Sequence, residues 1–269
     1  MRIVVCAKQV LDPDGVNSYA LWGRLSVDAS GRKFQAGGDI PQILNAYDEQ
    51  ATEAALRIRD DGVETEITAL ASGDESANTV LRRCVAMGVE NAVQVIDPQM
   101  GLADEFRSAR ILAAAINEIG NVDLVLCGRQ GSDYDQGSVP AVLAELLNAA
   151  YVTMARDVRA DGDGVRVTRV TPDGDEVVHA SLPAVVSVSN ELGQPRYPSS
   201  RGMMQARRNP PTVRQADQLL GGANGHAIEL VQLFVPDVQG HCEIIEGDSA
   251  TAKVETLVRR LKETGALSG

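Results

Sequence analysis

A short apolar run that ends at a glycine and leads into a helix is the feature that most restricts the fold of this chain. Residues 122–127 read Val-Asp-Leu-Val-Leu-Cys, and after Gly128 and several polar residues a helical pattern begins near residue 139. Nearly continuous apolar runs of this length are typical of strands buried on both faces of a parallel sheet. Where such a strand passes through a loop into a helix, the unpaired N–H groups and the helix dipole favour an anion. The sequence therefore predicts an α/β fold with a phosphate-binding loop.

The loop between residues 128 and 139 contains neither of the common nucleotide motifs. It begins Gly-Arg-Gln-Gly-Ser-Asp-Tyr-Asp, which matches neither the dinucleotide pattern G-x-G-x-x-G nor the P-loop. The three histidines and four cysteines are scattered, without the spacing of a zinc site or a disulfide framework. No Ser/His/Asp or Cys/His set can be assembled from them. We therefore predict a protein that holds a ligand, without catalytic side chains and without a metal.

Alternating strand and helix patterns extend this prediction to a parallel, doubly wound sheet. The strand patterns cover residues 2–7, 66–71, 92–96 and 122–127, and the helical patterns cover 48–59, 77–87 and 104–119. From residue 152 the hydrophobic period changes to two, with Gly-rich turns, which is typical of antiparallel hairpins. An apolar strand pattern returns at residues 184–188. We predict an α/β nucleotide-binding domain over residues 1–208, with a small antiparallel insertion at 152–182.

The last third of the chain has weaker signals. Residues 209–225 lack periodicity and contain Pro-Pro, Gly-Gly and Asn-Gly pairs, which favour an extended arm. Residues 253–264 have the pattern of one amphipathic helix. We expect residues 209–269 to form an extended arm followed by a C-terminal helix.

The composition argues against several classes of partner. A formal net charge of −12 argues against nucleic acid and an anionic membrane surface, because both require a basic face. No apolar run approaches the roughly 18 residues of a membrane span. The start, Met-Arg-Ile-Val-Val-Cys-Ala-Lys, has the pattern of a strand rather than of a signal peptide. We therefore expect a cytoplasmic protein with no nucleic-acid partner and no membrane insertion.

Six separated segments resemble the β subunit of electron transfer flavoproteins, and they follow the order of that family. The segments are Val-Val-Cys-Ala-Lys-Gln-Val-Leu-Asp at 4–12, Asn-Ala-Tyr-Asp-Glu-Gln-Ala-Thr-Glu-Ala-Ala-Leu at 45–56, Leu-Arg-Arg-Cys-Val-Ala-Met-Gly at 81–88, Gly-Arg-Gln at 128–130, Leu-Pro-Ala-Val-Val at 182–186 and Pro-Arg-Tyr-Pro-Ser at 195–199. The resemblance covers about residues 1–210. It implies a heterodimer with an α subunit that carries electrons from flavin dehydrogenases to a quinone reductase or another acceptor. Residues 209–269 would then contact the α subunit.

The resemblance also implies an adenine nucleotide in the β subunit, which is AMP in the respiratory type and FAD in the electron-bifurcating type. Carried over by position, the cofactor-binding residues would be Ala7, Asn45, Ala46, Tyr47, Asp48, Ser72, Gly128, Arg129, Gln130, Asp133, Asp135, Gln136, Gly137, Ser138 and Val139. Ala7, Asn45, Ser72 and Gly128 stand at or just beyond carboxyl ends of predicted strands or at helix starts, where open α/β sheets bind ligands. The residues implied in partner docking are Arg196, Tyr197, Ser200, Arg201 and Met203.

Two departures from the respiratory type bear on the ligand and the partner. The segment Gln136-Gly-Ser-Val lacks a threonine that the respiratory type places at the AMP phosphate. Arg129 and the Tyr-Pro-Ser-x-Arg-Gly-Met pattern at 197–203 lean toward the bifurcating and nitrogen-fixation-associated branch. We therefore favour FAD over AMP. Ser200 replaces a leucine that would insert into a pocket on the dehydrogenase, which removes roughly 2 kcal/mol of apolar burial. We expect the dehydrogenase partner to lie outside the usual acyl-CoA dehydrogenases, or to be bound by this subunit in a different way.

Several of these residues also permit simpler interpretations. Asp133 and Asp135 are compatible with a solvated turn, with contacts to ribose, or with bracing of the loop's own amides. Arg129 could instead form a surface ion pair, and the basic residues after 200 could form an ordinary solvated face. The alternative function is a stand-alone adenine-nucleotide-binding protein of the universal-stress-protein type. The Pro-Arg-Tyr-Pro-Ser segment favours the electron carrier, because a simple nucleotide binder has no use for it.

Overall fold

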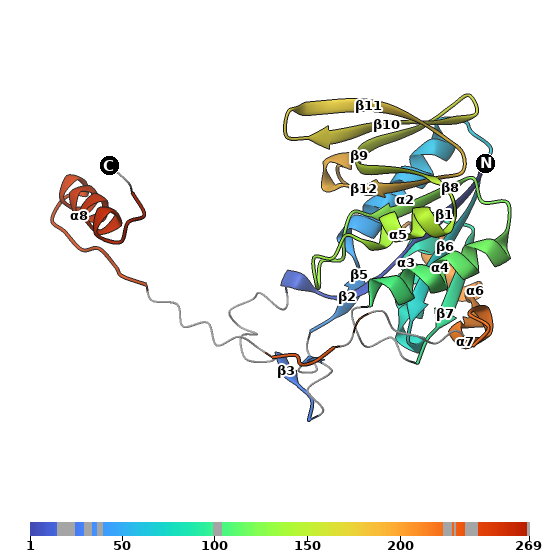
Figure 1. The fold of residues 1–269 in the computed structure, drawn as a ribbon, viewed down its shortest axis with the longest axis horizontal. Coiled ribbons are helices and arrows are strands. Elements are labelled where there is room, and N and C mark those ends of the chain that lie inside the picture. The colour runs from blue at the N-terminus through green and yellow to red at the C-terminus, as the bar shows by residue number, and fades with distance from the viewer. Residues whose placement is uncertain are drawn as a thin grey trace. The chain divides into compact units, whose positions relative to one another are not determined.

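The computed structural model describes residues 1–14, 25–29, 34–36, 40–98, 104–222, 228, 230–234 and 242–267. The chain divides into two compact units, residues 1–234 and residues 235–269 (Figure 1). No helix among the described residues is long and apolar enough to cross a bilayer.

A mostly parallel sheet forms the centre of the first unit. Among the described residues, nine strands pair in the order β11-β10-β9-β12-β8-β1-β6-β7-β13. Their bounds are β1 Arg2–Cys6, β6 Glu66–Gly73, β7 Asn91–Ile96, β8 Leu124–Gly128, β9 Ala150–Asp161, β10 Gly164–Thr171, β11 Gly174–Ser181, β12 Ala184–Val188 and β13 Thr212–Gln215. Two short antiparallel pairs lie outside it, β2 Gln9–Leu11 with β5 Gln42–Leu44 and β3 Leu25–Val27 with β4 Phe34–Ala36. The predicted α/β class is confirmed.

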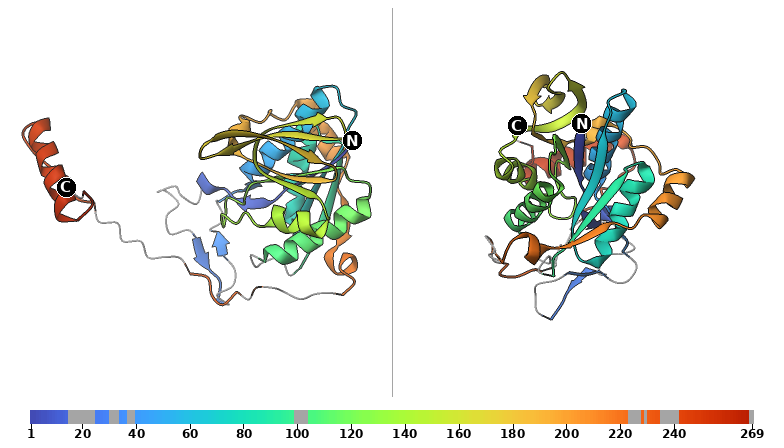
Figure 2. Two further views of the ribbon diagram at one scale, coloured as in Figure 1. Left: turned by 45° about the horizontal axis from the view of Figure 1, so that its top comes forward. Right: turned by 90° about the vertical axis from the view of Figure 1, so that its right-hand side faces the viewer.

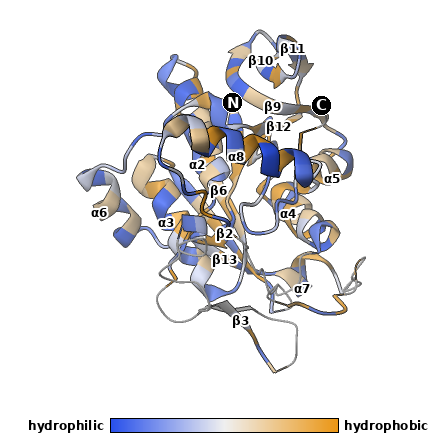
Figure 3. Cartoon of the chain, turned by 90° about the vertical axis from the view of Figure 1, so that its left-hand side faces the viewer, coloured by the Kyte–Doolittle hydropathy of each residue, from blue (hydrophilic) through white to orange (hydrophobic). Residues whose placement is uncertain are grey.

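Helices cover both faces of this sheet because the buried strands are apolar on both sides. Ile3 and Val5 pack in one cluster with α2 and α3, whereas Val4 packs with α4 and α5 in another. The helices are α2 Ala46–Asp60, α3 Asn78–Met87, α4 Glu105–Ile119, α5 Val139–Leu146, α6 Ser200–Arg208 and α7 Ala216–Leu219, with the short 3₁₀ turns η1 Glu75–Ala77 and η2 Asn190–Leu192. Figure 2 shows the sheet between these two layers, and Figure 3 shows hydrophobic colours on its central strands.

The antiparallel insertion extends the sheet on one side. β9, β10 and β11 pair antiparallel through two tight turns, and β12 then returns parallel to β8. This arrangement agrees with the change of hydrophobic period that the sequence shows after residue 152. The insertion therefore belongs to the same sheet as the parallel strands.

The start of the predicted arm is part of the fold rather than extended. Residues Thr212–Gln215 form β13 and pair parallel with β7, and Ala216 at the start of α7 is fully buried. A strand of four residues is too short to show a hydrophobic period, so only its pairing with an open sheet edge reveals it. Residues 223–227 of the predicted arm lie outside the described residues.

The second unit contains one described helix, α8 Ala250–Glu263, close to the predicted range of 253–264. Its start is capped by Ser249, whose Oγ accepts a hydrogen bond from Ala252 N at 3.2 Å. None of its residues is buried. The apolar side chains of Val254, Leu257 and Val258 are exposed and recur at helical spacing.

Gly202 in α6 gives a test of how this helix packs. A Cβ at this position would fall on the carbonyl oxygen of Ala86 in α3, far inside van der Waals contact. We expect Gly202→Ala to lower the free energy of unfolding by about 2 kcal/mol, because backbone must move to admit the methyl group. Urea denaturation measures the change. Met204→Ala, at an exposed position of the same helix, should stay within about 0.5 kcal/mol, and equal effects of the two changes would contradict the close contact.

Candidate functional site

Asp48 in the first turn of α2 ties together the ends of two neighbouring strands. Its Oδ2 accepts a hydrogen bond from Lys8 N at 2.7 Å, just after β1, and its Oδ1 accepts one from Gly128 N at 2.8 Å, at the end of β8. The side chain is only 6% exposed. Burial raises the pKa of Asp48 to about 6, although the hydrogen bonds from Lys8, Asn45 and Gly128 act in the opposite direction. Asp48 therefore fixes where both strand ends leave the sheet.

Gly128 is required by the close approach of α2. A Cβ on this residue would overlap the Asp48 carboxylate and lie 2.6 Å from Tyr47 Cβ. Any side chain here would push the helix start away from β8. A substitution of Gly128 therefore disturbs the brace as well as the loop.

Asn45 holds the loop that follows β8. Its Nδ2 donates to Gln130 O at 2.8 Å, and its Oδ1 accepts from Ser132 N at 3.2 Å. The residue is 1% exposed. Both sides of its amide are thus used within the protein, which orients residues 129–138, the β8–α5 loop.

The two aspartates of the β8–α5 loop have partners within the protein. Asp133 Oδ1 accepts from Lys8 Nζ at 2.7 Å, and Asp135 Oδ1 accepts from Gln130 Nε2 at 2.8 Å. Asp135 has a φ of 53°, and its N–H donates to Gly131 O at 2.9 Å. These contacts favour the bracing role among the alternatives, because they stabilise the loop and give Asp133 a counter-charge in Lys8.

The start of α5 presents backbone donors without partners. The helix begins at Val139, and Ser138 before it makes no side-chain capping hydrogen bond. The N–H groups of Gly137, Ser138 and Val139 have no acceptor among the described residues. Such groups, together with the helix dipole, attract phosphate or carboxylate. Gly137 also lets the loop pass close to Arg129, whose carbonyl oxygen would lie 2.9 Å from a Cβ at residue 137.

Buried polar atoms without a partner occur at the same end of the sheet. They are Ser72 Oγ, Ser132 Oγ and Arg129 Nε. Ser72 lies near the end of β6, next to β1, and Arg129 follows β8. The Arg129 guanidinium lies over the ring of Tyr47, 5.0 Å from its centroid. Because buried polar groups in proteins are nearly always hydrogen-bonded, these donors fit a ligand with an anionic and a hydroxyl-bearing part.

The structure places the predicted residues in two groups. Direct hydrogen bonds join Asn45 and Asp48 to the loops after β1 and β8, and Ala7 and Ser72 lie at neighbouring strand ends. The docking residues follow β12 instead. Tyr197 is 80% exposed and Met203 47% exposed, and Ser200 and Arg201 are exposed at the start of α6. Arg196 is held by the α2 residue Glu53 through its side chain and its backbone N–H.

Three residues of these two groups were not singled out from the sequence. Lys8 is next to Ala7 in a matched segment, and Ser132 is inside the loop, but neither has a distinctive spacing. Glu53 had no usable signal either, because at helical spacing it lies off the apolar stripe that contains Ala54 and Ile58. Only its burial in the structure shows that this charge requires a partner on another element.

Comparisons with known proteins find a family model and relatives that match most of this chain. A family model described as the electron transfer flavoprotein domain matches residues 38–219. The chain is 35% identical over 269 residues to subunit CarD of the caffeyl-CoA reductase-Etf complex of Acetobacterium woodii, with 98% of each chain covered. It is 31% identical to the electron transfer flavoprotein subunit beta of Megasphaera elsdenii, covering 97% of this chain and 98% of that one. It is 30% identical to the acryloyl-CoA reductase electron transfer subunit gamma of Anaerotignum propionicum, with 98% of each covered.

Asp48 predicts a characteristic pH dependence of stability. Its folded pKa of about 6 is above the ordinary aspartate pKa of 3.8, so the native state binds the proton more tightly than the unfolded chain does. The stability that this proton contributes is present below pH ~4 and is lost as the pH rises through about 6, by up to about 3 kcal/mol. Asp48→Asn should remove this part of the slope. Urea denaturation of both proteins between pH 4 and 7 measures it, and parallel pH profiles would contradict the buried ionisation.

Proposed function

The chain belongs to the electron transfer flavoprotein family as a β-type electron transfer subunit, and we propose that it binds an adenine nucleotide and pairs with an α subunit. In this proposal the heterodimer accepts electrons from a flavin dehydrogenase and delivers them to a quinone reductase or another acceptor. The observation that carries the nucleotide site is the β8–α5 loop. It is braced by α2 and leads to backbone donors that have no acceptor among the described residues.

The nucleotide would be held mainly by groups that the protein leaves unpaired. The N–H groups of Gly137, Ser138 and Val139 would bind phosphate, and the Ser72 hydroxyl would close another side of the pocket. The side chains of Asn45 and Asp48 are engaged in bracing the loops. We therefore assign residues 45–48 a shaping role beside Ala7, with the adenine along their backbone.

We propose FAD rather than AMP as this nucleotide. FAD has one more phosphate than AMP, and it supplies the reversible electron-accepting ring of the carrier. Arg129 provides a cation with an unpartnered donor, Nε, and it is stacked on Tyr47. Because Lys8 is already paired with Asp133, Arg129 is the cation that we assign to the second phosphate or the flavin, although its charge also acts on Glu191.

The names of two relatives suggest which partner to test first. They are described as parts of a caffeyl-CoA reductase complex and of an acryloyl-CoA reductase. We propose that this subunit serves a flavoenzyme acting on a CoA thioester. Ser200 cannot supply an apolar anchor, so contact with that enzyme would rest on the exposed Tyr197, Met203 and Met204.

The nucleotide content of the purified heterodimer tests the site. Acid release followed by absorbance and mass spectrometry should give close to two FAD per heterodimer, one in each subunit. In Arg129→Ala, which loses the contact to the second phosphate, the content should fall toward one FAD. One FAD and one AMP in the unaltered protein would establish the AMP type. An adenine nucleotide bound to a chain that does not pair with the α subunit would favour the stand-alone alternative.

The second unit gives a test of pairing. Because β13 pairs with the sheet and α7 follows it within the first unit, the informative truncation removes residues 235–269 and leaves that unit intact. Since α8 exposes Leu257 and its apolar neighbours without burying any residue, we expect this truncation to lower the yield of co-purified α subunit at least tenfold.

Two point variants make the same test within the full chain. Leu257→Ala should weaken co-purification, whereas Glu255→Ala, at an exposed polar position of the same helix, should not. Undiminished pairing by the truncated chain would contradict a partner-binding role for the second unit.

A further inference from the structure

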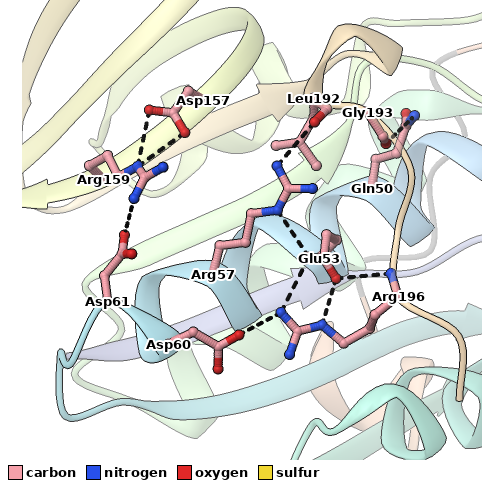
Figure 4. A network of polar contacts seen from close by, with 10 residues as sticks. All are labelled: Gln50, Glu53, Arg57, Asp60, Asp61, Asp157, Arg159, Leu192, Gly193 and Arg196. Atoms are coloured by element: carbon pink, nitrogen blue, oxygen red, sulfur yellow. Dashed lines mark hydrogen bonds and ion pairs between the residues drawn. The ribbon is translucent and has the colours of Figure 1, made fainter. Parts of the chain in front are cut away.

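The segment that follows η2 is held in place by side chains of α2. Within the described part of the chain, residues 194–198 form no backbone–backbone hydrogen bond. The residues just before them are fixed from α2 instead (Figure 4). Arg57 Nη1 donates to Leu192 O at 3.0 Å, and Gln50 Nε2 donates to Gly193 O at 3.4 Å. We call residues 194–199 the docking segment.

Glu53 makes the central contact to the docking segment. Its carboxylate accepts three hydrogen bonds from Arg196, from the backbone N at 3.1 Å, from Nε at 2.7 Å and from Nη2 at 3.2 Å. It also accepts one from Arg57 Nε at 2.9 Å, and Asp60 pairs with Arg196 Nη2 at 2.7 Å. Figure 4 shows both guanidinium groups converging on this one carboxylate.

The Glu53 carboxylate remains ionised in this position. The residue is only 5% exposed, and burial by itself raises its pKa. The hydrogen bonds from Arg196 and Arg57 outweigh that effect, so that the pKa is lowered overall. Both partners of the Glu53–Arg196 pair are therefore charged at neutral pH, and the pair fixes a backbone atom as well as a side chain.

The contact at Arg196 restricts the position of the neighbouring Tyr197 on the protein surface. Tyr197 is 80% exposed, although aromatic residues make up only 3% of the chain. On its other side, Ser199 Oγ accepts from Gly202 N at 3.0 Å, and Gly202 lies against Ala86 of α3. Tyr197 thus stands between two anchored points, and its partner would meet a preorganised surface.

The charge of α6 indicates the chemistry of that partner. The helix carries Arg201, Arg207 and Arg208, all exposed, and no acidic residue, on a chain of formal net charge −12. Its exposed Met203 and Met204 add adaptable apolar contacts. A complementary protein surface has an apolar pocket for Tyr197 with acidic residues around it.

We propose that Glu53 is a positioning residue for partner docking, holding Arg196 so that Tyr197 and α6 form one fixed surface for an acidic patch on the partner flavoenzyme. The inference rests on the proposed function, because it assumes that the docking segment meets that enzyme. It adds that α2 and its N-cap position both the docking segment and the β8–α5 loop, because Asn45 and Asp48 hold that loop. The docking surface and the nucleotide loop therefore keep a constant separation.

The first test asks whether Glu53 fixes the docking segment in the intact heterodimer. In Glu53→Gln, hydrogen exchange over residues 194–199 and trypsin cleavage after Arg196 should both accelerate about tenfold, because the segment opens more often. Glu49→Gln is the matched control, since Glu49 lies on the same helix and pairs with Arg83 instead, at 2.7 Å. Unchanged exchange and cleavage in Glu53→Gln would overturn the proposal.

The second test asks whether this fixation matters for docking. With the cognate flavoenzyme as electron donor, Glu53→Gln should raise the KM for the heterodimer about tenfold, with little change in kcat and in FAD content. A double-mutant cycle with Tyr197→Ala separates positioning from general destabilisation, because Glu53→Gln should have little further effect once Tyr197 is removed. Additive effects, or a KM unchanged by Glu53→Gln while Tyr197→Ala raises it, would overturn the positioning role. A KM unchanged by Tyr197→Ala would instead overturn the proposed docking surface itself.

Discussion

The polar side chains of α2 and of its N-cap Asn45 are the constraint on which the candidate sites depend. From its first turn, Asn45 and Asp48 hold the loops that leave β1 and β8. From its middle, Glu53 and Arg57 hold the segment that leaves β12. Loops at the end of a parallel sheet have no hydrogen-bonding pattern of their own, so a rigid neighbour must define them. One helix and its N-cap thus hold the loops that follow β1, β8 and β12.

Two buried carboxylates on this helix are stabilised in different ways. Asp48 receives backbone N–H groups and little cationic charge, so burial dominates and its pKa rises. Glu53 receives two guanidinium groups, so its pKa falls despite burial. The physical difference is the partner's charge, because a neutral donor stabilises an anion less than a cation does. Asp48 therefore couples the β8–α5 loop to pH near its pKa of about 6, whereas Glu53 stays ionised in that range.

The parallel and the antiparallel strands of the sheet have different roles. The parallel strands β1, β6, β8 and β12 are buried on both faces and bring the loops of the candidate site to one end. The antiparallel strands β9–β11 extend the sheet on one side, and Arg159 of β9 pairs with Asp61 just beyond α2 (Figure 4). The insertion thus also contacts the C-terminal end of the helix that braces the loops.

Regular elements with a strong period were determined by the sequence alone. The apolar run at 122–127 corresponds to β8 at Leu124–Gly128, and the helical pattern at 48–59 corresponds to α2 at Ala46–Asp60. Hydrophobic periodicity is a local property, so it can be recognised in a short segment without knowledge of the rest of the fold. The fold class and the place of the β8–α5 loop followed from it, and the order of matched segments indicated the family.

The tertiary structure alone decided the pairing of β13 with β7 and the contacts Lys8–Asp133 and Glu53–Arg196. Each of these joins residues more than 100 positions apart, and no local pattern specifies which distant partner a short strand or a buried charge will meet.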